Sequence, residues 1–179
     1  MPSFDYSQAG AYFVTIVTHK RELLFEDTVL TEIVQAEWEK LPTRFPALAL
    51  DAFVVMPNHV HAIIIVTNGV GAIHELPLPG TRLERRLMLL PRVIGYFKIK
   101  VAKNVNRLRD AVGAPAWQRN YFEHIVRSEE ELNRVREYVH DNPANWALDK
   151  ENPVNQEPDE QKDWQIHKIR RGGRTWGQS

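Results

Sequence analysis

The sequence predicts an α+β fold of ferredoxin-like type, in which helices pack on a mainly antiparallel sheet. Segments with strand character and segments with helical periodicity follow one another in the order β-α-β-β-α-β-α. Two of the strands are joined by Pro57-Asn58, a pair of residues that favours a tight turn. The 179 residues, of which 43% are hydrophobic and 26% charged, suit one globular domain with or without a tail.

The first half of the chain is expected to supply three strands and one helix. Tyr12–Thr18 is β-branched and aromatic with period-two character, which predicts a strand. Asp27 is placed to cap the helix that follows, and Pro42 is expected to end it. Leu48–Met56 and His59–Val66 are the predicted strands of the hairpin. The apolar stripe of the helix consists of Val29, Ile33, Ala36 and Leu41.

The middle of the chain is expected to form a loop, a helix and an extended segment. Residues 68–81 contain glycine and proline and predict a loop. Pro91 is expected to be the first residue of a helix that runs to about Asn106. Trp117–Val126 is predicted as a strand or an extended segment. One face of the helix carries Ile94, Phe97, Val101 and Val105.

The strongest helix signal begins at Ser128, which fits a capping box with Glu131. Pro143 ends this helix. Its apolar stripe consists of Leu132, Val135 and Val139. The residues beyond it are polar with little periodicity. We therefore expect a domain over residues 1–146 and a polar C-terminal extension, with a basic end, over residues 147–179.

Composition excludes several classes of protein and site. The chain has no cysteine, which excludes a disulfide framework, a thiol nucleophile and a Cys-ligated metal. The longest apolar runs, such as residues 62–66, are too short to span a membrane, and the N-terminal sequence lacks the pattern of a signal peptide. We therefore expect a cytoplasmic protein.

The charges are balanced overall but segregated along the chain. Lys and Arg number 23, and Asp and Glu also number 23. Residues 82–109 nevertheless contain a single acid, Glu84, among nine bases. Such segregation predicts a positive surface on a neutral protein, although solvated helix faces remain the alternative. The bases of this segment are Arg82, Arg85, Arg86, Arg92, Lys98, Lys100, Lys103, Arg107 and Arg109.

His59 and His61 open a predicted strand and lie two residues apart. Residues at that spacing point to the same face of a sheet, about 6.5–7 Å apart along the strand. The two imidazoles can therefore converge on one divalent metal ion, or they can be structural histidines at a strand end. Because no cysteine is present, an oxygen ligand is expected to complete such a site, which favours Mg²⁺ or Mn²⁺.

Tyr138 and Asn142 lie four residues apart on the predicted last helix, so their side chains share one face. A tyrosine beside a metal-bound phosphate can attack phosphorus, and the asparagine can supply an oxygen ligand to the metal. The alternatives are a tyrosine at the edge of the core and an asparagine that only ends the helix. Tyr121 is the rival nucleophile, but it has no ligand partner at helical spacing.

Three runs of the sequence resemble a known family. VVMPNHVHAIIIV, at Val54–Val66, resembles the HUH motif of the single-tyrosine HUH transposases. WQRNYFEHIVRSEEELNRVREYVHDNP, at Trp117–Pro143, is similar to the second half of the same signature. YFVTIVTHKRELLF, at Tyr12–Phe25, resembles the first strand and the loop after it. Within this family the chain most resembles the REP-associated tyrosine transposases, over about residues 8–148.

The resemblance implies a domain, residues 1–146, that cuts and rejoins single-stranded DNA near hairpins during DNA transposition and recombination. His59 and His61 match the histidines that bind a divalent metal, Mg²⁺ or Mn²⁺. Tyr138 matches the nucleophile that forms a 5′-phosphotyrosine intermediate, and Asn142 matches the third metal ligand. A DNA-binding protein that no longer mobilises DNA and a metal-dependent hydrolase without a covalent step remain alternatives.

The resemblance also implies where DNA binds. The basic segment over residues 82–109 is the expected surface for the DNA backbone, and the basic tail suits contacts beside the hairpin. We therefore expect hairpin or single-stranded DNA as the partner, a nucleoid location, and a chain that can form a homodimer. The tail residues expected to contact DNA are Arg170 and Arg171.

Overall fold

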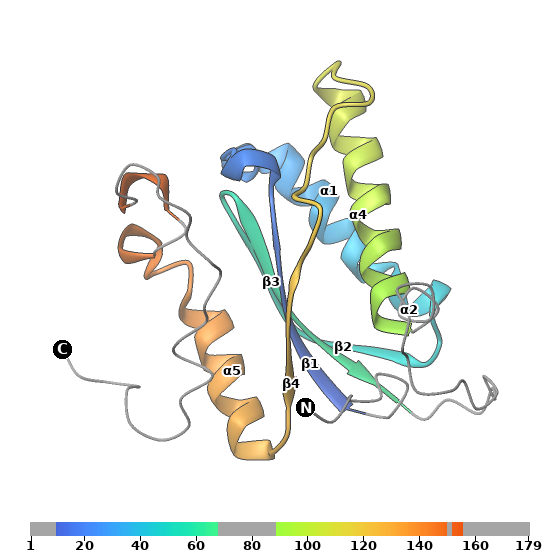
Figure 1. Cartoon of the computed structure of the whole chain (residues 1–179), viewed down its shortest axis with the longest axis vertical. Helices are drawn as coiled ribbons and strands as arrows, with labels where there is room; N and C mark the ends of the chain where they lie inside the picture. The colour runs from blue at the N-terminus through green and yellow to red at the C-terminus, as the bar shows by residue number, and fades with distance from the viewer. Residues whose placement is uncertain (1–9, 68–88, 150–151, 156–179) are drawn as a thin grey trace.

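A four-stranded antiparallel sheet forms the centre of the molecule (Figure 1). The computed structural model describes residues 10–67, 89–149 and 152–155. The strands lie in the order β2-β3-β1-β4, so β3 and β1 are central. This arrangement confirms the predicted α+β fold of ferredoxin-like type. The strands are β1 (Gly10–Val17), β2 (Leu48–Met56), β3 (His59–Val66) and β4 (Phe122–Val126).

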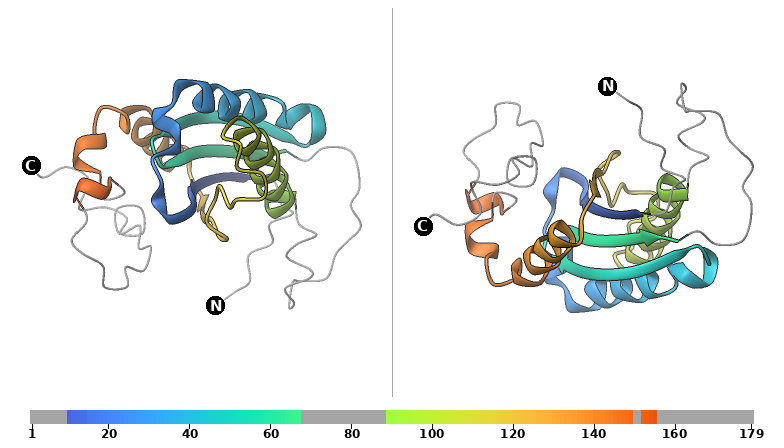
Figure 2. Two further views of the ribbon diagram at one scale, coloured as in Figure 1. Left: turned by 90° about the horizontal axis from the view of Figure 1, so that it is seen from above. Right: turned by 90° about the horizontal axis from the view of Figure 1, so that it is seen from below.

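Helices cover both faces of the sheet (Figures 1 and 2). α1 and α4 lie on one face, and α5 lies on the other. The α-helices are α1 (Thr28–Glu39), α2 (Leu41–Arg44), α4 (Leu89–Leu108) and α5 (Glu129–Asp141). Short 3-10 helices are η1 (His19–Arg21), η2 (Leu24–Glu26), η3 (Trp146–Leu148) and η4 (Pro153–Asn155). Within the described residues, no helix is long and apolar enough to cross a membrane.

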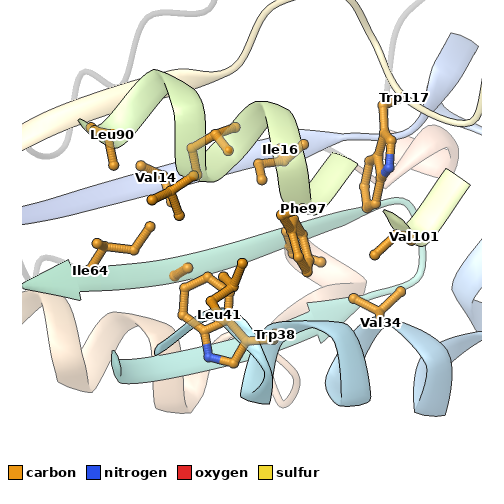
Figure 3. Packing of buried hydrophobic residues seen from close by; sticks show 14 of the residues in the cluster. Val14, Ile16, Val34, Trp38, Leu41, Ile64, Leu90, Phe97, Val101 and Trp117 are labelled. Atoms are coloured by element: carbon orange, nitrogen blue, oxygen red, sulfur yellow. The ribbon is translucent and has the colours of Figure 1, made fainter. Parts of the chain in front are cut away.

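The larger core lies between the sheet and the pair α1 and α4 (Figure 3). Alternate residues of β1 and β3 face it because successive side chains of a strand point to opposite faces. Trp38 of α1 stacks on Phe53 of β2 with ring centroids 4.5 Å apart, and Phe97 of α4 meets the same tryptophan edge-on at 5.8 Å. The strand residues of this core include Tyr12, Val14, Ile16, Val60, Ala62 and Ile64.

The smaller core lies under α5. The remaining residues of the two central strands, Phe13 and Ile63 among them, face this side. The predicted apolar stripe of the last helix packs on them, which confirms that prediction. The helix residues that pack here are Leu132, Val135 and Val139. The sheet therefore separates two cores that have no strand side chains in common.

The structure corrects the predicted face of α1. Asp27 caps the helix as expected, since its Oδ1 accepts hydrogen bonds from the backbone N–H groups of Val29 and Leu30. The side chain of Val29, however, is 52% exposed. The large Trp38 side chain packs in the core, so the neighbouring stripe of the helix is the buried one. The sequence pattern alone fits either stripe. The buried stripe of α1 and α2 consists of Leu30, Val34, Trp38 and Leu41.

Several predicted helix ends also differ in detail. Pro42 lies in the first turn of α2, after α1 has ended at Glu39. Pro91 lies in the first turn of α4, where a missing N–H costs no intrahelical bond, but Leu89 precedes it in the helix. The helix also runs two residues beyond Asn106.

The start of α5 and the segment before it depart from the expected pattern as well. Ser128 Oγ accepts the N–H of Glu131 at 3.1 Å, as in a capping box. The Glu131 carboxylate instead accepts the backbone N–H of Arg127 at 2.7 Å and contacts His124 Nε2 at 2.8 Å. Of the predicted extended segment before this helix, only its end forms β4, while Trp117 makes an isolated bridge to Thr18.

Lys98 of α4 anchors the segment that precedes β4. Its Nζ donates to the backbone carbonyls of Gln118, Arg119 and Asn120 at 2.7, 3.1 and 3.4 Å. Burial of this ammonium group lowers the pKa of Lys98. Lys98 therefore has a structural role, in a helix whose basic residues are predicted to contact DNA.

We expect Lys98→Ala to lower the free energy of unfolding by about 1–3 kcal/mol, because hydrogen bonds that involve a charged group contribute on this scale. Urea denaturation followed by circular dichroism measures the change. Lys103→Ala, on an exposed position of the same helix, is the control and should leave stability nearly unchanged. Equal stabilities for the two variants would show that the carbonyl contacts contribute nothing.

Candidate functional site

The two histidines of β3 face α5 and meet at their Nε2 atoms, 3.0 Å apart. The Nδ1 atom of each ring has a hydrogen-bonding partner that holds the ring in place. His59 Nδ1 lies 2.7 Å from Asn58 Oδ1, and His61 Nδ1 lies 2.8 Å from Thr15 Oγ1 on the neighbouring strand β1. An amide oxygen can only accept, so His59 carries its proton on Nδ1 and presents a lone pair at Nε2. The Thr15 hydroxyl can serve either tautomer of His61.

Burial keeps both histidines neutral. It lowers the pKa of His61 to about 3 and that of His59 well below its usual value. A proton on His61 and the charge of Arg21 would also disfavour protonation of His59, which lowers its pKa further. A neutral imidazole is the form that binds a metal ion, so both rings are ready as ligands at neutral pH.

Tyr138 extends from α5 toward this pair, as the sequence spacing predicted. Its hydroxyl lies 3.4 Å from His61 Nε2, and its ring packs edge-on against Phe13 at 5.9 Å between centroids. Burial raises the pKa of Tyr138 to about 12; the charge of Asp149 adds to the rise, and a hydrogen bond with Asn142 opposes it. The phenol is therefore protonated at neutral pH and needs activation before it can act as a nucleophile.

Asn142 ends α5 one turn after Tyr138, and only 4% of it is exposed. Among the described residues, its Oδ1 atom is buried without a hydrogen-bond partner. A buried amide oxygen without a partner is costly, so this oxygen is available to accept from or coordinate a ligand.

Asp149 is a site residue that the sequence analysis missed. After α5 the chain turns through η3, where the Trp146 ring lies 6.0 Å from that of His59. The ligand atoms of Asp149, His59 and His61 all lie within 4.8 Å of one another. Asp149 falls in the segment assigned to the polar extension, among several acids, and no spacing in the sequence distinguishes it.

These residues fit a divalent metal ion. Neutral imidazole nitrogens and carboxylate oxygens are ligands that divalent metal ions take in proteins. The two imidazoles and the Asp149 carboxylate form a donor set of nitrogen and oxygen. The unpartnered Asn142 Oδ1 is a further oxygen close to the nucleophile.

The other titratable candidates lie elsewhere. Tyr121 packs against the core on the α1 and α4 side, so the sheet separates it from the histidine pair. Tyr12 and Tyr96 belong to the same core. His124 is bound to Glu131 at 2.8 Å. Of the tyrosines that the structure describes, Tyr138 is the one that contacts the histidines.

The described part of the basic segment lies on and just after α4, on the face of the sheet opposite to the histidine pair. Lys98 is engaged by backbone carbonyls, and Arg109 lies 3.5 Å from the Glu22 carboxylate. The other described bases of this segment, which stay predictions as DNA contacts, are Arg92, Lys100, Lys103 and Arg107. Arg82, Arg85, Arg86, Arg170 and Arg171 lie outside the described residues.

Two known proteins are similar to the chain in sequence, and a solved structure is similar to it in fold. No family model matches the chain. An uncharacterized protein of Haemophilus influenzae is 32% identical over 158 residues, which cover 82% of this chain and 87% of that protein. The two proteins therefore belong to one family. A second Haemophilus influenzae protein, provisionally named REP-associated tyrosine transposase, is 24% identical over 78% of this chain and 73% of its own length.

The chain is similar to REP-associated tyrosine transposases in sequence and in fold. A solved structure of a REP-associated tyrosine transposase bound to a REP hairpin matches with a TM-score of 0.58 at 18% identity. The match covers 84% of this chain and 76% of that one. At this identity, the match establishes the shared fold.

We expect the protein to bind Mn²⁺ and His61→Ala to weaken that binding by more than about a hundredfold, because even groups that only orient a ligand account for roughly tenfold to a hundredfold. Asp149→Ala should weaken it as well. Isothermal titration calorimetry measures both. His124→Ala is the matched control, since its ring pairs with Glu131. Unchanged Mn²⁺ affinity in His61→Ala would show that the histidine pair does not form the site.

Proposed function

We propose that the chain is a metal-dependent endonuclease and strand transferase that cuts and rejoins single-stranded DNA near hairpins. The observation that carries this proposal is the position of Tyr138, whose hydroxyl lies 3.4 Å from His61 Nε2 within one chain. A tyrosine can form a covalent intermediate, and two neutral histidines can hold a metal ion that polarises a phosphate. Similarity to the REP-associated tyrosine transposases supports the same reaction class.

The residues of the site have separate tasks in this reaction. His59, His61 and Asp149, with Asn142 as a further oxygen donor, would hold Mg²⁺ or Mn²⁺. A bound ion of this kind polarises the scissile phosphate and offsets charge that develops in the transition state. Asn142 is hydrogen-bonded to Tyr138 and would hold the phenol in place beside the phosphate.

The covalent step conserves the energy of the phosphodiester. The Tyr138 oxygen attacks phosphorus, its proton leaves to solvent, and the bond between phosphorus and the 3′ oxygen breaks. The 3′ oxygen takes up a proton, and the 5′ phosphate remains on Tyr138 as a phosphotyrosine. Attack by another 3′-OH on this phosphotyrosine restores the phenol and joins the two strands, so the reaction needs no external energy source.

A DNA hairpin or single strand is the proposed partner. The solved relative is bound to a REP hairpin, which supports the same class of ligand for this chain. Lys100, Lys103 and Arg107 lie on one stripe of α4, at spacings of three and four residues. We propose that this stripe contacts the phosphate backbone, which sets affinity without selecting sequence. Because the histidines and Tyr138 meet within one chain, a homodimer is not needed to complete the site.

We expect Tyr138→Phe to bind hairpin DNA with nearly wild-type affinity and to form no covalent adduct, because only the attacking oxygen is lost. Denaturing gels of labelled hairpin-bearing single strands, with Mg²⁺ and EDTA arms, measure the adduct, and mass spectrometry maps it. Tyr121→Phe is the control and should still form one. Full cleavage by Tyr138→Phe, or a nucleotide on Tyr121, would reject the proposed nucleophile.

We expect replacement of Lys100, Lys103 and Arg107 by Gln to weaken single-strand binding and to reduce the slope of log K against log salt concentration by about 2, at roughly 0.7 per phosphate contact. Fluorescence anisotropy over a salt series measures the slope. Lys98→Gln is the control, because its ammonium group is already bound to carbonyls. An unchanged slope in the triple variant would mean that this stripe is a solvated face.

A further inference from the structure

A β-bulge in β2 contains Asp51, which faces α5, the helix that carries Tyr138. Leu50 pairs with Ile64 and Phe53 pairs with Ala62, so two residues of β2, Asp51 and Ala52, oppose the single residue between them on β3. Leu50 and Phe53 both pack on the α1 and α4 side. Regular alternation would place residues three apart on opposite faces of the sheet. The extra residue of the bulge allows both to face the same side. The two residues between them, Asp51 and Ala52, both lie on the α5 side.

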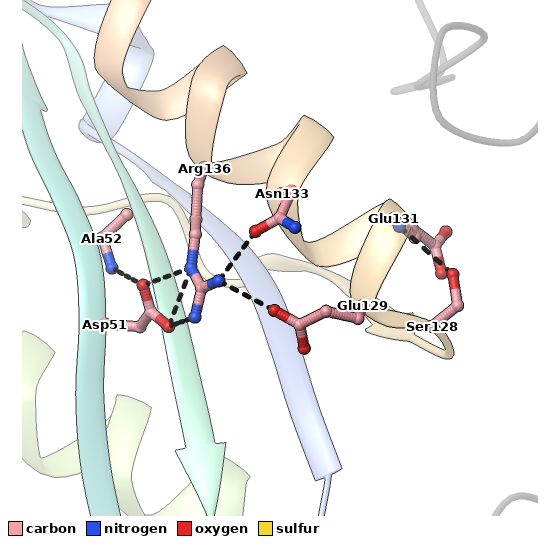
Figure 4. Close-up of polar contacts among 7 residues, drawn as sticks. All are labelled: Asp51, Ala52, Ser128, Glu129, Glu131, Asn133 and Arg136. Carbon is pink, nitrogen blue, oxygen red and sulfur yellow. Dashed lines mark hydrogen bonds and ion pairs between the residues drawn. The ribbon is translucent and has the colours of Figure 1, made fainter.

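Asp51 meets Arg136 of α5 in a two-pronged ion pair (Figure 4). Arg136 Nε lies 3.0 Å from Asp51 Oδ1, and Nη2 lies 2.6 Å from Oδ2. The Asp51 carboxylate also accepts the backbone N–H of Ala52 at 2.8 Å, and Arg136 holds the pKa of Asp51 below its usual value. The carboxylate is thus fixed by the bulge itself.

The guanidinium is fixed from its own helix as well. Nη1 of Arg136 donates to Asn133 Oδ1 at 2.9 Å and lies 3.2 Å from Glu129 Oε1 (Figure 4). Because its own helix already holds the guanidinium group of Arg136, this group loses little further side-chain freedom when it binds the carboxylate. The pair therefore costs less conformational entropy than an isolated surface ion pair. It joins α5 to the edge strand β2, whose residues Ala52 and Val54 also pack in the core under this helix.

Arg136 precedes Tyr138 by two residues, and Asn142 follows one turn later. A shift of α5 along the sheet would therefore move the nucleophile and the amide together relative to the histidines. We propose that Asp51 and Arg136 are positioning residues that hold α5 on the chain's own sheet, so that Tyr138 reaches His61. This role rests on the proposed function, because the position of Tyr138 matters only if its oxygen attacks DNA.

Asp51→Asn and Arg136→Gln test the proposal in the full-length protein, with labelled hairpin-bearing single strands and Mg²⁺. The expected result is a fall in the single-turnover rate of adduct formation of roughly tenfold to a hundredfold, the scale of a misplaced reacting group. DNA affinity should remain at its wild-type value. Arg134→Gln removes the same charge from an exposed position of α5 and is the matched control.

A covalent link separates positioning from charge and from stability. The chain has no cysteine, so Asp51→Cys with Arg136→Cys introduces the one pair of thiols. This double variant should form adduct slowly, and joining its thiols with a short bis-maleimide should restore the rate. Thermal unfolding confirms that each variant is folded at the assay temperature.

The outcomes separate the two proposals. No adduct from the wild-type protein would reject the proposed function. An adduct from the wild type, with equal rates for Asp51→Asn and Arg136→Gln, would reject the positioning role alone. Slow single variants that the covalent link fails to restore would also reject it, because the loss would then come from charge or stability and not from the placement of α5.

Discussion

The alternation of side chains along β3 is the constraint on which the rest of the structure depends. β3 is a central strand with helices on both sides, so its two faces are both buried. His59, His61 and Ile63 face α5, whereas Val60 and Ala62 face α1 and α4. A slip of one residue would exchange the two sets and place the histidines in the apolar core. Packing of residues that do no chemistry therefore fixes the candidate site.

Burial of that site sets its electrostatics. Removal from water disfavours charge on either kind of group, so it keeps the histidines neutral and the phenol protonated. For His61 this is the form that binds a metal. For Tyr138 it is the unreactive form. The same desolvation thus leaves the imidazoles free to bind a metal ion and leaves the phenol in its protonated, unreactive form.

The sheet also separates the described basic residues of α4 from the candidate site. The described basic residues of α4 lie on one side, and the histidine pair lies on the other. A strand of DNA that contacts Lys103 must therefore pass an edge of the sheet before it reaches His61. The edge strand β2 carries Asp51 at its bulge, and this residue pairs with Arg136 of α5 on the histidine side of the sheet.

The sequence alone determined the elements and contacts that are local along the chain. The bounds of β2 and β3, the shared face of His59 and His61, and the spacing of Tyr138 and Asn142 follow from the period of a strand or a helix. Asp149 joins the histidines, and Lys98 binds carbonyls rather than facing solvent, only because segments far apart in the sequence meet. Periodicity describes one element at a time, so only the tertiary structure decided which groups lie across from one another.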